Sequence, residues 1–109
     1  MAIGYKVLGQ QAPTATTELD LYTVPAATEA VASSITITNR GTTISTFRVS
    51  IAVGGGATGI KNYLYYDLPI AGNDTFIATI GVTLTATDVI RVYASSANLT
   101  FQLFGSEIS

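Results

Sequence analysis

The chain has 109 residues, of which 48% are hydrophobic, and its five Lys or Arg and seven Asp or Glu side chains give a formal net charge of −2. A chain of this length supports one domain with one core, and the absence of Cys excludes a disulfide framework or a thiolate site. The acidic balance and the scattered cations argue against a nucleic-acid-binding protein, which needs a basic patch.

Residues 1–18 carry no sustained hydrophobic period. Tyr5 and Val7 flank Lys6 and predict one short strand, and the remainder of the segment is typical of an extended arm. A frayed terminus is one interpretation of such a segment. The alternative is an arm that becomes ordered on a neighbouring subunit. We therefore separate residues 1–18 from a single domain over residues 19–109.

Alternating apolar and polar residues, the pattern of a half-buried strand, begin at Leu19 and end at Pro25. The same alternation covers residues 34–39 and, most strongly, residues 46–53. Residues 28–33 tolerate a helical turn, but the Ile/Thr alternation that follows them favours the start of a strand. No long helix is predicted.

The second half of the chain repeats this pattern between turn residues, after a glycine run at residues 54–56 that predicts a flexible hairpin tip. Further strands are expected over residues 62–67, 75–80, 89–94 and 99–104. Seven or eight short strands at near-regular spacing predict an all-β fold, an antiparallel β-sandwich of the jelly-roll or Ig-like type. A closed barrel is the less favoured alternative.

The inward sides of the alternating segments define the predicted core. Its members are large aliphatic and aromatic side chains, each on the apolar face of an expected strand. They are Leu21, Ile35, Ile37, Phe47, Val49, Ile51, Leu64, Ile90, Val92, Leu99, Phe101 and Leu103.

Side chains with catalytic chemistry are sparse in this sequence. General acid–base catalysis needs a group that titrates near neutral pH, and His and Cys are both absent. The carboxylates are dispersed, and most stand beside turn residues, where Asp caps backbone donors. A paired-carboxylate hydrolase is the alternative that these residues leave open. We predict that the chain is not an enzyme, and we assign no catalytic, cofactor-binding or metal-ligating residue.

Two local patterns have both a functional and a structural interpretation. Asp67, Asn73 and Asp74 flank one loop and could bind a hard cation through oxygen, but they lack the dense acidic spacing of a calcium loop, so a turn is favoured. The sequons at Asn73 and Asn98 are interpreted as accidental, because no export signal is recognised in the sequence.

Tyrosines gather in one expected strand and are the clearest candidate contact residues. A tyrosine offers apolar area and one hydroxyl, which suits core packing, a protein interface or stacking on a sugar ring. The high hydrophobic content of the chain favours burial against another subunit. The candidate interface consists of Tyr5, Val7, Leu8, Tyr63, Tyr65 and Tyr66.

Several strand-type motifs carry a resemblance to a known class of proteins. They are YTVPA at residues 22–26, ASSITITNR at 32–40, FRVSI at 47–51, YLYYD at 63–67 and DVIRVYA at 88–94. With them, residues 19–105 resemble small structural proteins of tailed phages, notably marine and cyanobacterial phages. The resemblance implies a β-sandwich that is present in many copies in the virion. It brings no functional residues with it.

The expected function is that of a non-enzymatic virion structural protein, a capsid decoration or cement protein on the outside of a tailed-phage head. A tail, neck or fibre component is the alternative, and a carbohydrate-binding module is a third. The expected partners are other copies of the chain, with a trimer as the first expectation, and the major capsid protein or tail proteins. Neither nucleic acid nor a cofactor is expected.

The expected location is the particle exterior, after synthesis in the host cytoplasm. The amino terminus does not resemble a secretory signal, and no apolar run approaches the roughly 20 residues of a membrane-spanning helix. A membrane partner is therefore not expected.

Overall fold

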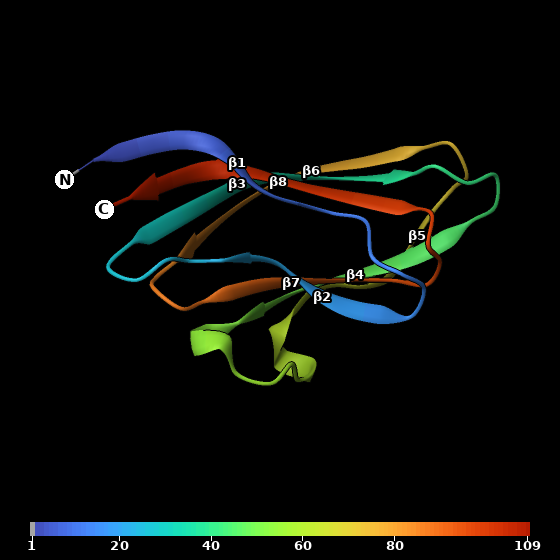
Figure 1. Ribbon diagram of the computed structural model, residues 1–109. Helices are drawn as coiled ribbons and strands as arrows, with labels where there is room; N and C mark the ends of the chain where they lie inside the picture. Colours follow the sequence, from blue (N-terminus) through green and yellow to red (C-terminus); the bar gives the residue numbers. More distant parts are fainter. Residues whose placement is uncertain (1) are drawn as a thin grey trace.

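The computed structural model describes residues 2–109, which form two four-stranded antiparallel sheets packed face to face (Figure 1). The only helical segments in this range are two short 3-10 turns, Val53–Gly55 and Ile60–Asn62, and no helix within it is long and apolar enough to cross a membrane. The strands are β1 (Ile3–Gln11), β2 (Thr17–Thr23), β3 (Glu29–Asn39), β4 (Ser45–Ala52), β5 (Tyr63–Ile70), β6 (Thr75–Leu84), β7 (Val89–Ala94) and β8 (Leu99–Ile108).

The strand order defines the type of sandwich. One sheet has the order β1-β8-β3-β6 and the other has the order β2-β7-β4-β5. Along the chain, every connection except that from β4 to β5 crosses from one sheet to the other. Eight strands in two sheets with these crossing connections form a jelly roll, whereas an Ig domain has a different strand order. The predicted antiparallel sandwich is confirmed, and its jelly-roll form is selected.

The core lies between the two sheets and matches the predicted set closely. Phe47, Phe101 and the inward aliphatic residues of β3, β4, β7 and β8 are fully buried. Ile51 is only partly buried and packs against this core. Leu64 is 39% exposed, so its assignment to the core was wrong. Val49 pairs with Tyr65 and the next residue, Ser50, pairs with Tyr63, so the register skips Leu64. Tyr65 takes the inward place that was expected for Leu64.

The first half of the expected arm is a strand of the sandwich. Residues 3–11 pair antiparallel with β8 over their whole length, and β2 already begins at Thr17. The inward positions of β1 include Gly4, Lys6 and Gly9, opposite inward residues of β8, and Leu8 at the bulge packs against the core. Gly4, Lys6 and Gly9 give no apolar signal, so the sequence predicted only one short strand around Tyr5 and Val7 where the structure has nine residues of strand. The sandwich therefore includes residues on both sides of the expected boundary at residue 18.

Candidate functional site

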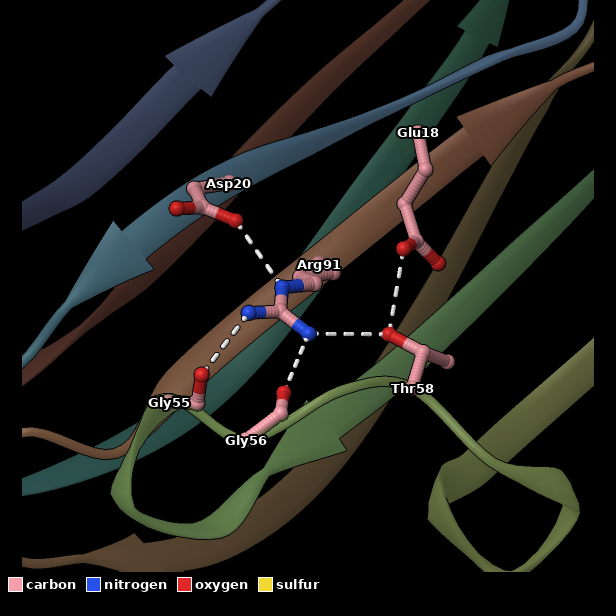
Figure 2. A network of polar contacts seen from close by, with 6 residues as sticks. All are labelled: Glu18, Asp20, Gly55, Gly56, Thr58 and Arg91. Atoms are coloured by element: carbon pink, nitrogen blue, oxygen red, sulfur yellow. Dashed lines mark hydrogen bonds and ion pairs between the residues drawn. The ribbon is translucent and has the colours of Figure 1, made fainter.

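The outer face of the β2-β7-β4-β5 sheet carries a polar network centred on Arg91 of β7. Figure 2 shows its guanidinium group between Asp20 of β2 and the loop that follows β4. Arg91 Nε donates to Asp20 Oδ1 at 3.0 Å, and Nη1 donates to the Gly56 carbonyl at 2.6 Å and to Thr58 Oγ1 at 3.0 Å. Nη2 donates to the Gly55 carbonyl at 3.2 Å. The Arg91 guanidinium therefore fastens the glycine-rich loop to the sheet through hydrogen bonds to the loop's carbonyl groups.

Arg48 of β4 forms a second cluster on the same face. Its Nε donates to Asp67 Oδ1 at 2.6 Å, and Nη2 donates to Oδ2 at 3.3 Å. The guanidinium carbon lies 4.4 Å from the ring centre of Tyr66 and 4.3 Å from that of Tyr93. The hydrogen bonds to Asp67 raise the pKa of Arg48. Cation–π contacts on two rings and a bidentate carboxylate hold the guanidinium in one orientation.

The structure divides the predicted tyrosine cluster between surface and core. Tyr63 and Tyr66 meet edge to face on the outer side, with ring centres 4.8 Å apart. Tyr65 points inward, where its ring lies 6.1 Å from that of Phe47 and 5.4 Å from that of Phe76. Only Tyr63 and Tyr66 therefore remain as surface contact candidates from this strand.

The outer face of the β1-β8-β3-β6 sheet has a different composition, and it holds the other predicted interface residues. Tyr5 is 85% exposed and Val7 is also exposed, whereas Leu8 packs against the core. Between its two ends this face presents apolar, Ser, Thr and Gln side chains. The outward positions, in cross-strand register, include Ile3, Tyr5, Val7, Gln10, Val31, Ser34, Thr36, Thr38, Ile77, Thr79, Thr83, Thr100, Gln102, Phe104, Ser106 and Ile108. We call this surface the uncharged face.

Charged residues stand at the two ends of the uncharged face. Glu29 begins β3 opposite Ile108, and Arg40 directly follows the last residue of β3. Arg40 Nε donates to Thr100 Oγ1 at 2.9 Å, and Nη2 donates to the Ala97 carbonyl at 2.8 Å. This face was not predicted from the sequence. Its signal is the outward placement of Ile3, Tyr5 and Val7, which can be recognised only once the pairing of β1 with β8 is known.

Glu107 of β8 occupies an inward position near one end of the sandwich and connects three strands. One carboxylate oxygen accepts a hydrogen bond from the Tyr22 hydroxyl at 2.5 Å, and the other lies 2.5 Å from Lys6 Nζ. The bond from Lys6, followed by that from Tyr22, lowers the pKa of Glu107. Burial and the bond to Glu107 raise the pKa of Tyr22. The carboxylate thus ties β8 to its neighbour β1 and, across the core, to β2.

Other carboxylates considered in the sequence have structural partners. Asp88 accepts hydrogen bonds from the amides of Gly54 and Thr85, and Asp74 accepts one from the amide of Thr75. Asp67 binds Arg48, as described above. Within residues 2–109 there is no group of three or more His, Cys, Asp or Glu side chains that could hold a metal ion. Asp74 and Asp88 therefore cap turns, as the sequence predicted, whereas Asp67 forms an ion pair.

Comparisons with known proteins give a likeness of fold. No protein-family model matches the sequence, and no curated protein matches it. Among solved structures, the chain is similar to a chain from the structure of infectious bursal disease virus, Gx strain, with a TM-score of 0.53 and 6% sequence identity. The match covers 97% of this chain and 31% of the viral chain, so this chain spans about a third of that protein. The similarity shows a shared sandwich fold.

Proposed function

We propose that this chain is a non-enzymatic structural protein of a tailed-phage virion, and that it serves as a decoration or cement protein on the outside of the head. The observation that carries the proposal is the amount of apolar side chain left exposed on a well-packed sandwich. Ile3, Tyr5, Val7 and Ile77 project from the uncharged face, and Val53 and Ile60 project from the loop between β4 and β5. Apolar surface of this kind marks sites that contact other proteins.

The mechanism is burial of apolar surface against neighbouring subunits of the shell. At roughly 25 cal/mol per Å² of apolar area, a standard-sized contact contributes several kcal/mol before the costs of association. Repetition over a symmetric shell adds avidity. The sandwich suits this role because, among residues 2–109, no buried side-chain nitrogen or oxygen lacks a hydrogen-bond partner.

The fold likeness supports a viral role. The similar chain belongs to a structure of a virus, and the jelly roll is an architecture used by viral capsid domains. The phage-type motifs in the sequence support the tailed-phage assignment in particular. A non-enzymatic role is supported by the side chains themselves, because Asp67, Asp74 and Asp88 are engaged with Arg48 or with backbone amides.

A tail, neck or fibre component is the second candidate. The observation that favours it is the edge-to-face pair of half-buried Tyr63 and exposed Tyr66 on β5, an edge strand that could contact a receptor or an adjoining tail protein. A carbohydrate-binding module gains less support. The Arg48 guanidinium lies over the rings of Tyr66 and Tyr93, so part of the aromatic surface that a sugar would need is already covered.

Immunogold labelling of purified virions tests the proposal. Antibodies against the recombinant chain should label the heads of particles made by the phage that encodes it, at many positions per head. Label confined to tails would support the second candidate and contradict the first. Absence of the chain from the virion proteins detected by mass spectrometry would contradict both.

A further inference from the structure

We infer that the uncharged face binds a second copy of this chain about a two-fold axis. The strands of the two copies run antiparallel across the contact, and Glu29 of each copy lies opposite Arg40 of the other. This inference deepens the proposed function. It depends on that function only for the choice of a second copy of the chain as the partner. It concerns the isolated chain in solution, so it can fail while the location in the virion stands.

The contrast between the two outer faces is the first step. Charged side chains line the β2-β7-β4-β5 face, where they bind one another or the loop and suit contact with water. Among residues 2–109, the opposite face has no charged side chain between Glu29 and Arg40. It nevertheless exposes large apolar groups, with Tyr5 at 85% and Ile77 at 70% exposure, in a lattice of Ser, Thr and Gln. Depletion of charge with retention of aromatic and aliphatic groups is the composition of an interface core.

The positions of the two charges select the orientation of the second copy. Glu29 and Arg40 stand at opposite ends of β3, about 36 Å apart at roughly 3.3 Å per residue, so they do not interact within one copy. A two-fold axis that crosses β3 near its centre reverses the strand direction. It brings the acidic end of each copy to the basic end of the other, so that both charge pairs form at once. An axis parallel to the strands would instead bring the two Glu29 residues close together.

The size of the face agrees with a stable dimer. Four strands spaced about 4.8 Å apart and a length of about 36 Å give a footprint of roughly 700 Å². A standard interface buries about 800 Å² on each partner. Sheets packed face to face with a small crossing angle are a common arrangement, and an isologous two-fold contact is the commonest form of self-association.

Sedimentation equilibrium of the recombinant chain and a set of charge-reversed variants tests the inference. The native chain should have a mass of about twice 11.3 kDa. Glu29→Arg and Arg40→Glu should each weaken the dimer by about tenfold or more, because each places like charges at both ends of the contact. An equimolar mixture of the two variants should recover the native affinity as a heterodimer, since both of its pairs are again opposite in sign. The double variant should recover it as a homodimer.

Matched substitutions away from the face serve as controls. Lys61→Glu reverses an exposed charge on the loop side of the molecule and should leave the dimer unchanged. Ile77→Ser should weaken the dimer about tenfold, whereas Ile60→Ser, which removes a side chain that is 93% exposed on the loop, should not. Circular dichroism verifies that each variant is folded.

Four results would overturn the inference. One is a chain that stays monomeric at millimolar concentration, and another is a dimer that is insensitive to substitutions at residues 29, 40 and 77. A trimer, or single variants that weaken association without recovery in the mixture, would contradict the two-fold antiparallel arrangement.

Discussion

Phe47 is the side chain that connects the two sheets at the centre of the molecule. It belongs to β4, and its ring lies 5.3 Å from Phe76 of β6 and 6.3 Å from Phe101 of β8, which are both in the opposite sheet. The ring of Tyr65 on the neighbouring strand β5 completes the cluster. Because aromatic pairs contribute beyond their buried area, this cluster should dominate the energy of the core.

Phe47→Ala should lower the free energy of unfolding by about 3–5 kcal/mol, since it leaves a cavity among aromatic rings that cannot close it. Phe101→Ala should have a similar effect. Urea denaturation followed by circular dichroism measures both. Ile44→Ala, at an exposed position in the loop before β4, serves as the control and should change the stability by less than about 0.5 kcal/mol. A loss below about 1 kcal/mol at both phenylalanines would contradict the described core.

At the scale of the strands, the sequence predicted those elements whose apolar residues face inward. Residues 34–39, 46–53, 89–94 and 99–104 all lie within or largely overlap strands of the structure. β1 is longer than the short strand predicted around Tyr5 and Val7, because Ile3, Tyr5 and Val7 face outward and, apart from Leu8, its inward places are mostly taken by glycine and lysine. β5 differed because its register shifts at two points, which placed Leu64 outside the core. Register shifts depend on the partner strand, so local alternation cannot predict them.

Close backbone approach at the shifted register of β3 and β8 favours glycine at position 105. A Cβ atom added to Gly105 would collide with the carbonyl of Val31, whereas one added to Gly4 would meet nothing within 4 Å. Gly105→Ala should therefore destabilise the protein by about 1–3 kcal/mol through forced separation of the strands. Gly4→Ala in the neighbouring strand should be close to neutral. Equal denaturation midpoints for the two variants would contradict this description of the sheet.

The contacts of Glu107 predict a pH-dependent attachment of β1 and β2 to β8. The fold lowers the pKa of this carboxyl below its ordinary value of about 4.3. Its contribution to stability is therefore complete above that ordinary value and is lost as the pH falls through the lowered pKa of the folded state. Glu107→Gln should cost about 1–3 kcal/mol at pH 7.

This cost should shrink as the pH falls from about 5 towards 2, because the native carboxylate is then protonated and loses its ion pair with Lys6. Denaturation curves of the two proteins at several pH values measure the difference. A difference that is the same at pH 7 and at pH 3 would show that the carboxylate is not stabilised by the fold.

At the scale of the whole molecule, the distribution of charge between the two faces is the feature that the sequence could not provide. Asp20, Arg48 and Arg91 are far apart in the chain, yet the jelly-roll order brings β2, β4 and β7 together in one sheet. The same order leaves Glu29 and Arg40 at the ends of the other sheet. The composition predicted few side chains with catalytic chemistry and an excess of apolar surface. The outer face that carries this surface depends on the sheet to which each strand belongs, which composition does not determine.

The direct test of a cement role is the stability of phage heads with and without this chain. Particles assembled without the protein should bind the recombinant chain up to a saturating number of copies. The temperature at which the heads rupture and release DNA should then rise by several degrees, because each bound copy stabilises the intact shell in proportion to its affinity. Heads that bind no added protein, or that rupture at the same temperature when saturated with it, would contradict the proposed function.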